Sequence, residues 1–249
     1  MTRTRCVAAA VAAAMLILRG DVANGQSFGF MMDAGYRDDV HGNGYHLSSP
    51  YGGLAVFGII QGFAEKNVAV VIPVNGELRA GTRGQMELNG NFDLMVRLSN
   101  LTVGAGMDYR YPSTPDIPEA QLGEDVTVFD PQRIGYSGSA RLSLGSTGRT
   151  FIQGRYITYP ASLTIGSPGG CGTEYYACRP DEYPPGARDG REMRIGVGYA
   201  LGTEASVSTK ILRVQFVQQQ FDFEPQGDNR WGAYNRRSRM ITFGIIWMM

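Results

Sequence analysis

The only two histidines of the chain, His41 and His46, lie in one polar segment, directly after the carboxylates Asp38 and Asp39. A carboxylate that orients an imidazole is typical of the general base of a hydrolase. His41 with Asp38 or Asp39 is therefore the catalytic candidate of the sequence. A hydrolase would also need acidic groups from other segments. The glycine-rich surroundings are equally typical of a solvated loop, and we favour the loop.

Two of the three cysteines, Cys171 and Cys178, lie close together in a stretch rich in glycine and proline. In an exported protein such a pair is expected to be oxidised, so we predict a disulfide. A zinc site would need further ligands, and no histidine lies nearby in the sequence. We therefore expect neither a metal nor a cofactor.

The same stretch carries three tyrosines, Tyr175, Tyr176 and Tyr183. Tyrosines on a loop stiffened by prolines and a disulfide offer contact area to an extracellular ligand. They could equally pack against the body of the protein. A surface-binding loop is thus one of two interpretations.

Charged residues occupy alternate positions of several segments, where they would share one face of a strand. They are Asp33, Arg37, Glu87, Asp93, Arg97, Asp108, Arg110, Arg141, Arg155, Glu192, Arg194 and Lys210. Around a lumen, such charges would either line a narrow water-filled pore or pair with one another and close it. An unpaired buried ion costs several kcal/mol, and side chains nearly fill a barrel of this size. We therefore favour a lumen plugged by ion pairs.

The composition indicates strands rather than helices. The chain has 34 glycines, 13 tyrosines and 11 phenylalanines among 249 residues. Glycine weakens a helix by roughly 1 kcal/mol per interior position, whereas aromatic and β-branched residues favour strands. The formal net charge is zero, so no basic surface for nucleic acid is indicated.

The elements that must position the charges are strands with alternating faces. The clearest lies between Gln85 and Leu98, where apolar and polar residues alternate at nearly every position. Such a period of two places one set of side chains on each face of a strand. The segment from Leu101 to Tyr111 repeats the pattern after a tight turn at Ser99–Asn100.

The links between the expected strands are alternately short and mostly long. We expect them at 37–52, 64–67, 79–84, 99–100, 112–132, 145–148, 161–190, 202–204 and 221–238. Tight turns at one end and long loops at the other are typical of outer-membrane barrels. We predict an all-β fold, a closed antiparallel transmembrane barrel of about ten strands, with eight or twelve as alternatives.

Residues 1–25 have the features of a secretory signal peptide. Arg3 and Arg5 precede an apolar run that ends near Leu18, and the small residues Ala23 and Gly25 follow. The apolar run is too short to span a bilayer as a helix. We therefore expect a cleaved signal at 1–25, whose removal takes Cys6 with it, and a barrel domain at 26–249.

The last strand of the sequence carries a motif. Thr242, Gly244, Trp247 and Met249 resemble the C-terminal β-signal of bacterial outer-membrane proteins, with Met249 where that family usually has Phe or Trp. The resemblance implies a Gram-negative outer-membrane location and recognition by the assembly machinery. It also implies contact with outer-membrane lipid and lipopolysaccharide. As an architecture, the mature chain resembles small OmpA-like or OmpW-like barrels, without a motif of any one functional family.

Three classes of function follow. The first is a non-enzymatic outer-membrane barrel with a structural, surface-binding or narrow-channel, porin-like role. The second is an outer-membrane hydrolase that uses His41 at the rim. The third is a soluble periplasmic barrel that binds an apolar ligand. We expect the first class.

Overall fold

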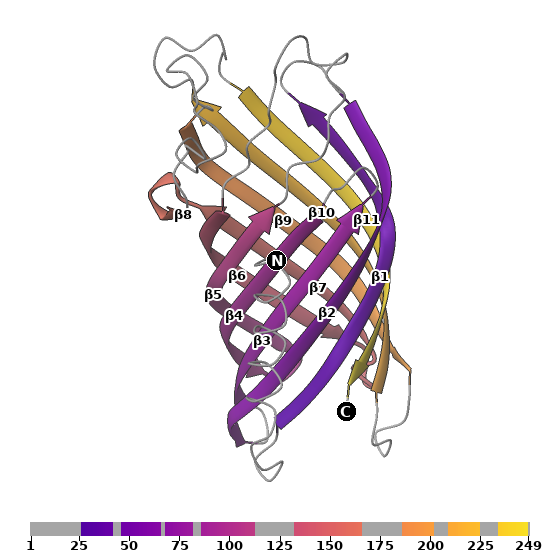
Figure 1. The fold of residues 1–249 in the computed structure, drawn as a ribbon. Coiled ribbons are helices and arrows are strands. Elements are labelled where there is room, and N and C mark those ends of the chain that lie inside the picture. The colour runs from indigo at the N-terminus through magenta and orange to yellow at the C-terminus, as the bar shows by residue number, and fades with distance from the viewer. Residues whose placement is uncertain are drawn as a thin grey trace, which may run out of the picture.

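The computed structural model describes residues 26–41, 46–65, 68–81, 86–112, 132–165, 186–201, 209–224 and 234–248. Almost all of them lie in strands (Figure 1). The strands are β1 Gln26–His41, β2 His46–Glu65, β3 Val68–Gly81, β4 Met86–Leu98, β5 Leu101–Pro112, β6 Gln132–Leu144, β7 Thr150–Tyr159, β8 Thr164–Ile165, β9 Gly186–Leu201, β10 Thr209–Glu224 and β11 Tyr234–Met248. A 3-10 turn, η2 Ala161–Leu163, lies between β7 and β8.

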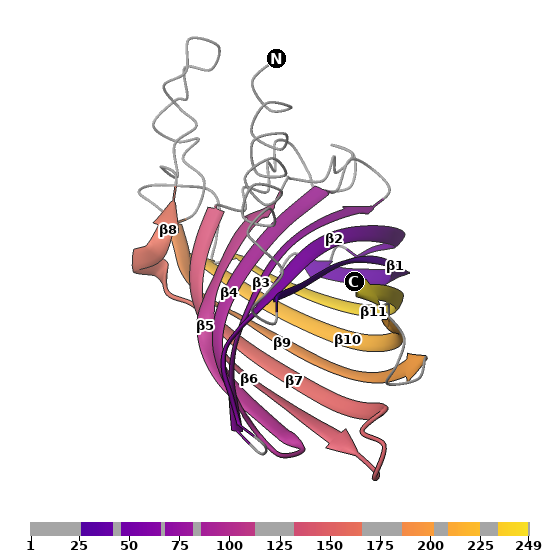
Figure 2. The same cartoon turned by 90° about the horizontal axis from the view of Figure 1, so that it is seen from below.

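The strands close into one antiparallel barrel. Consecutive strands pair from β1 to β7, β7 pairs with β9, and β9, β10 and β11 continue the sheet. The first and last strands then pair from Gly29–Met248 to His41–Arg236, which leaves no open edge in the ring (Figure 2). The two-residue β8 adds to the end of β6 and is not part of the ring. The predicted closed barrel of ten strands is confirmed.

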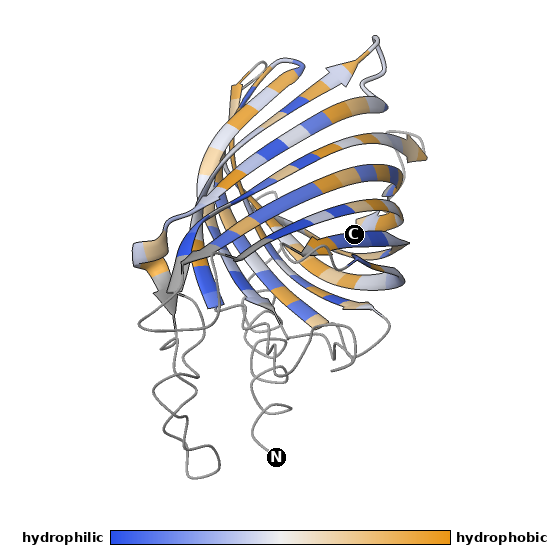
Figure 3. Ribbon diagram, turned by 90° about the horizontal axis from the view of Figure 1, so that it is seen from above, coloured by the Kyte–Doolittle hydropathy of each residue, from blue (hydrophilic) through white to orange (hydrophobic). Residues whose placement is uncertain are grey.

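The barrel is polar inside and apolar outside. In β11, for example, Ile241 is 50% exposed and Phe243 is 63% exposed, whereas Thr242 between them is 1% exposed. Figure 3 shows the same alternation of hydrophilic and hydrophobic positions along the strands. Because successive side chains of a strand point to opposite faces, the buried polar set faces the lumen. A soluble globular protein has the opposite arrangement.

The two ends of the barrel differ in their connections. We call the end that carries the β4–β5 turn and residue 248 the turn end. There Ser99 has φ 56° in a two-residue turn, and Gly145 has φ 72° in the link between β6 and β7. The other end, which carries the links at 113–131 and 166–185, is called the loop end. The long links therefore leave the barrel on one side, as the sequence predicts.

The strands run farther toward the loop end than the sequence predicts. Only residues 42–45 separate β1 from β2, in place of the expected link 37–52. Likewise, 225–233 separates β10 from β11 in place of 221–238. Near this end both faces of the strands carry polar residues, so the apolar–polar contrast disappears while backbone pairing continues. The apolar–polar alternation therefore ends before the strand itself ends.

No helix among the described residues is long and apolar enough to cross a membrane. The predicted signal peptide, 1–25, lies outside the described residues.

Candidate functional site in the barrel lumen

Glu87 of β4 lies at the centre of a group of buried side chains near the loop end. Its Oε2 is 3.1 Å from Nη1 of Arg37 in β1, and its Oε1 is 3.1 Å from Nε of Arg110 in β5. Gln219 of β10 donates Nε2 to the same Oε1 at 3.2 Å. One carboxylate thus receives donors from three other strands, which compensates its burial.

A second carboxylate pair, Glu77 and Glu192, continues this group. Glu77 Oε2 lies 2.8 Å from Nη2 of Arg79 and 3.5 Å from Nη1 of Arg194. Arg194 also pairs with Glu192 through Nε. Gln219 donates Nε2 to Glu192 Oε2 at 2.8 Å as well as to Glu87, so its amide joins the two groups.

We call this connected set of Arg37, Arg79, Arg110, Glu77, Glu87, Glu192, Arg194 and Gln219 the charged layer. Two of its contacts join opposite walls. Four strands separate β4 from β10 in either direction around the ring, and four also separate β3 from β9. The contacts Glu87–Gln219 and Glu77–Arg194 therefore reach across the lumen rather than along its wall.

The charged layer extends to the seam between the first and last strands. Asp39 of β1 lies 3.0 Å from Nε of Arg37 and 3.4 Å from Nη2 of Arg236 in β11. Asp39 is fully buried and Arg236 is 3% exposed. These pairs tie β1 to β11 where the ring closes.

Aromatic rings pack beside the charged layer. The guanidinium of Arg110 lies 4.2 Å from the ring centre of Phe221, and that of Arg133 lies 4.7 Å from it. Tyr159 packs against the same ring at 5.7 Å between centroids. Two cations on one aromatic ring gain attraction from its π-face in a site that water does not reach.

A second group of charges lies nearer the middle of the barrel. Arg155 of β7 pairs with Asp93 at 2.5 Å and with Asp108 at 2.7 Å, and its Nη2 donates to Oγ of Ser137 at 2.8 Å. A bidentate guanidinium holds carboxylates in a fixed geometry. On the opposite side of the lumen, Asp33 lies 3.8 Å from Nη2 of Arg213.

Toward the turn end the inner face becomes apolar. Met31, Ala69, Phe151 and Ile211 are buried there, with exposures of 5%, 0%, 1% and 5%. The ring of Phe151 occupies the space in which Gly198 would carry a Cβ atom. The lumen therefore has a charged half and an apolar half.

Most of the predicted lumen charges are buried on the inner face. The residues so placed are Asp33, Arg37, Glu87, Asp93, Asp108, Arg110 and Glu192, with Arg155 and Arg194 only slightly exposed. Arg141 is half-buried with its guanidinium 3.6 Å from the ring centre of Phe151. Arg97 has the inward parity of β4 but is exposed at the turn end.

Lys210 is a correction. It is exposed and alternates with the buried Ile211, so it shares the outer face of β10 with Leu212 and Val214. The pairing of β10 with β9 is regular at Ile211 and shifts only between Phe221 and Phe223. Odd-numbered residues of β10 therefore face the lumen.

Sequence reasoning missed six inward charges, namely Asp39, Glu77, Arg79, Arg133, Arg213 and Arg236. Asp39 and Arg236 had been assigned to links, and Arg79 lies just beyond the predicted end of its strand. Arg213 shares the inner face of β10 with Ile211 and Gln215, whereas the prediction had chosen Lys210 on the other face. The alternation of Glu77 and Arg79 with Leu78 and Ala80 was the available signal.

The rim residues are divided between the two faces of the barrel. Asp38 lies on the outer face, where Ser48 Oγ donates to its Oδ1 at 2.6 Å and Nδ1 of His46 lies 3.8 Å away. Asp39 belongs to the inner face, and the side chain of His41 lies outside the described residues. Ser48 contacts the carboxylate of Asp38 rather than the imidazole of His46, so Ser48 and His46 form no nucleophile–base pair. The described residues contain no cluster of potential metal ligands.

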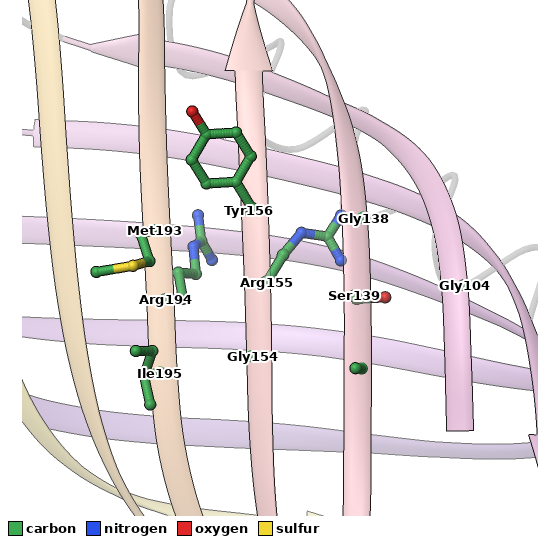
Figure 4. A pocket seen from close by; sticks show the side chains of 10 residues that line it. Gly104, Gly138, Ser139, Gly154, Arg155, Tyr156, Met193, Arg194 and Ile195 are labelled. Atoms are coloured by element: carbon green, nitrogen blue, oxygen red, sulfur yellow. The ribbon is translucent and has the colours of Figure 1, made fainter. Parts of the chain in front are cut away.

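The wall between β5 and β9 has a hollow of about 510 Å³ (Figure 4). Its lining includes the glycines Gly104, Gly138 and Gly154, with Tyr156 and Met193 beside them. No carboxylate, histidine or cysteine lines this hollow.

The other predicted sites lie either in the last strand or outside the described residues. In β11, Thr242 and Gly244 are buried, and Trp247 stacks on Phe30 of β1 at 4.7 Å between centroids. The predicted disulfide and surface loop, with Cys171, Cys178, Tyr175, Tyr176 and Tyr183, and also Met249, lie outside the described residues.

Comparison with known proteins gives structural neighbours alone. No family model and no curated protein matches the chain. Solved structures that are similar include the outer membrane protein OprD from Pseudomonas aeruginosa, with 12% identity, a TM-score of 0.33, and coverage of 90% of this chain and 60% of that one. OccAB2 from Acinetobacter baumannii has 12% identity and a TM-score of 0.35, covering 80% and 51%. A Pseudomonas aeruginosa FadL homologue has 9% identity and a TM-score of 0.29, covering 90% and 89%.

The chain thus spans about 60% of the length of OprD and about half of OccAB2. At these identities and scores the likeness assigns no function. Membership of the OmpA-like or OmpW-like barrels stays a prediction.

Proposed function

We propose that this chain is an integral outer-membrane β-barrel whose lumen is closed by the charged layer, so that it forms no steadily open pore. Its role is then structural or surface-binding and depends on the loop end. Glu77–Arg194 and Glu87–Gln219, the contacts between opposite walls, carry this proposal.

Membrane insertion is supported by the distribution of apolar side chains. Large apolar residues are exposed on the outer face of all ten ring strands, with Phe30, Leu54 and Phe243 among them. In water this exposed apolar surface would promote aggregation, whereas in a bilayer it would contact the acyl chains of the lipids. A closed ring also leaves no unpaired backbone groups at an edge, which a bilayer requires. These features disfavour a soluble barrel that binds an apolar ligand.

Closure of the lumen is supported by burial and pairing together. Glu77, Glu87 and Glu192 are each at most 3% exposed, and each has an Arg or Gln donor from another strand. Breaking a buried pair by removing one partner costs about 3–5 kcal/mol. A water-filled path through the layer would need several such pairs to separate at once.

The outward position of Asp38, His46 and Ser48 disfavours a rim hydrolase. A hydrolytic site between opposite walls needs its groups on the inner face. Asp39, the inward carboxylate of this region, already pairs with Arg37 and Arg236.

The test has two steps on the full chain. Membrane fractionation and gel mobility with and without heating should find a folded, heat-modifiable protein in the outer membrane. Reconstitution into planar bilayers should then give no steady single-channel current. A protein in the soluble periplasm would overturn membrane insertion, and steady current steps would overturn closure.

A further inference from the structure

The outer wall changes from apolar to basic within one step along β9, β10 and β11. The strand register aligns Ile195, Phe216 and Ile241 in one row on the outer face. Ile195 is 46% exposed and Ile241 is 50% exposed. This row is the last apolar one before the loop end.

The next two rows toward the loop end carry three arginines. The first row aligns Met193, Gln218 and Arg239, and the second aligns Arg191, Gln220 and Arg237. All three arginines are exposed. We call Arg191, Arg237 and Arg239 the basic rows.

The guanidiniums of the basic rows have no carboxylate partner among the described residues. Arg191 donates Nε and Nη2 to the neutral amide oxygen of Gln220, at 3.2 and 2.7 Å. Arg237 and Arg239 make no ion pair within that part of the chain. Asp38, which faces Arg239 across the strand pair, accepts from Ser48.

Two further carboxylates of β9 and β10 lie near this end: Asp222 accepts from Gln220 at 3.3 Å, and Asp189 accepts from the backbone N–H of Ala161 at 2.8 Å. Within the described residues, the three arginines of the basic rows therefore form no salt bridge with the carboxylates near them. This contrasts with the lumen, where the charged layer pairs its arginines with carboxylates.

The spacing suits a phosphate. Neighbouring strands lie about 4.8 Å apart and residues two apart on a strand about 6.8 Å apart, so the three arginines attach within roughly 12 Å of one another. Guanidinium groups bind phosphate oxygens in a bidentate manner, which makes arginine well suited to this ligand. The ligand would sit directly above the apolar row, where acyl chains end and headgroup phosphates begin.

We propose that Arg191, Arg237 and Arg239 bind the phosphate groups of a phosphorylated lipid in the outer leaflet. The inference rests on membrane insertion as proposed above. A lipid fits better than a free anion because the basic rows continue a surface that faces acyl chains.

The test uses the folded full chain in neutral detergent and follows its heat-modifiable gel mobility. Diphosphoryl lipid A should raise the unfolding midpoint of the wild type more than phosphatidylcholine does. In R191Q/R237Q/R239Q the apparent lipid A affinity should fall by about tenfold or more, because a lost charge-assisted hydrogen bond is worth at least that factor. R237Q/R239Q should show a smaller loss.

The matched control is R149Q/K210Q, which removes two cations at the turn end and should respond to lipid A as the wild type does. An unchanged response of R237Q/R239Q and the triple variant would overturn the proposal, as would equal stabilisation by phosphatidylcholine or inorganic phosphate. A chain with no heat-modifiable form would instead contradict membrane insertion itself.

Discussion

The two halves of the lumen are filled in different ways. Near the loop end, carboxylates such as Glu87 hold arginines from several strands. Near the turn end, the ring of Phe151 packs over Gly198, and Met31 is buried on the inner face. The charged residue nearest to Met31 in the sequence is Asp33. Charges need exact partners, because an unpaired buried ion is costly, whereas apolar packing tolerates small changes. The charged half should therefore respond more strongly to single substitutions.

The largest effect is expected for Glu87→Ala. The substitution leaves Arg37 and Arg110 without their shared carboxylate and should lower the free energy of unfolding by about 3–5 kcal/mol. Urea unfolding in detergent, followed by gel mobility, measures it. Asp38→Asn, which alters an exposed carboxylate, is the control and should change little. A loss for Glu87→Ala no larger than that of the control would remove the proposed difference between the halves.

A smaller effect is expected in the apolar half. In Gly198→Ala the new methyl group meets the ring of Phe151, and such overpacking costs typically about 1–3 kcal/mol. Gly138→Ala is its control, because an added Cβ there has no atom within 4 Å. The same urea titration compares them, and equal stability of the two variants would show that Phe151 is not packed as described.

The smallest effect concerns the boundary between the halves. Arg141→Gln removes a cation that lies 3.6 Å from the ring centre of Phe151 and should cost about 0.5–2 kcal/mol. Phe151→Leu removes the other partner of this contact, so the double variant should lose less stability than the sum of the two single substitutions in a double-mutant cycle. Full additivity of the two single substitutions would argue that the cation–ring contact contributes nothing.

The sequence predicts the barrel well because the bilayer demands a strict apolar–polar alternation, which β4 and β11 display. The candidate site is predicted less completely. Where strands extend beyond the apolar surface, residues such as Asp39 and Arg236 still face inward although their neighbours are polar. Lys210 shows the opposite error. An error of one residue in the alternation of β10 assigns this outward lysine to the lumen.

The contacts between opposite walls could not be predicted from one sequence. Alternation assigns Glu77 and Arg194 to the inner face of their strands, but it does not say which strands lie opposite. That depends on the number of strands in the ring and on their stagger. The basic rows are likewise visible only once the register aligns Arg191 with Arg237.

The most direct test of the proposed closure is the planar-bilayer current of E192A/R194A beside that of the wild type. This variant removes one acid and one base, while Glu77 keeps Arg79 and Gln219 keeps Glu87. D38N/R239Q, which removes the same charges from the outer face, is the matched control. The account predicts steady current steps for E192A/R194A and none for the wild type or the control. Steady steps in the wild type, equal to those of E192A/R194A, would contradict it.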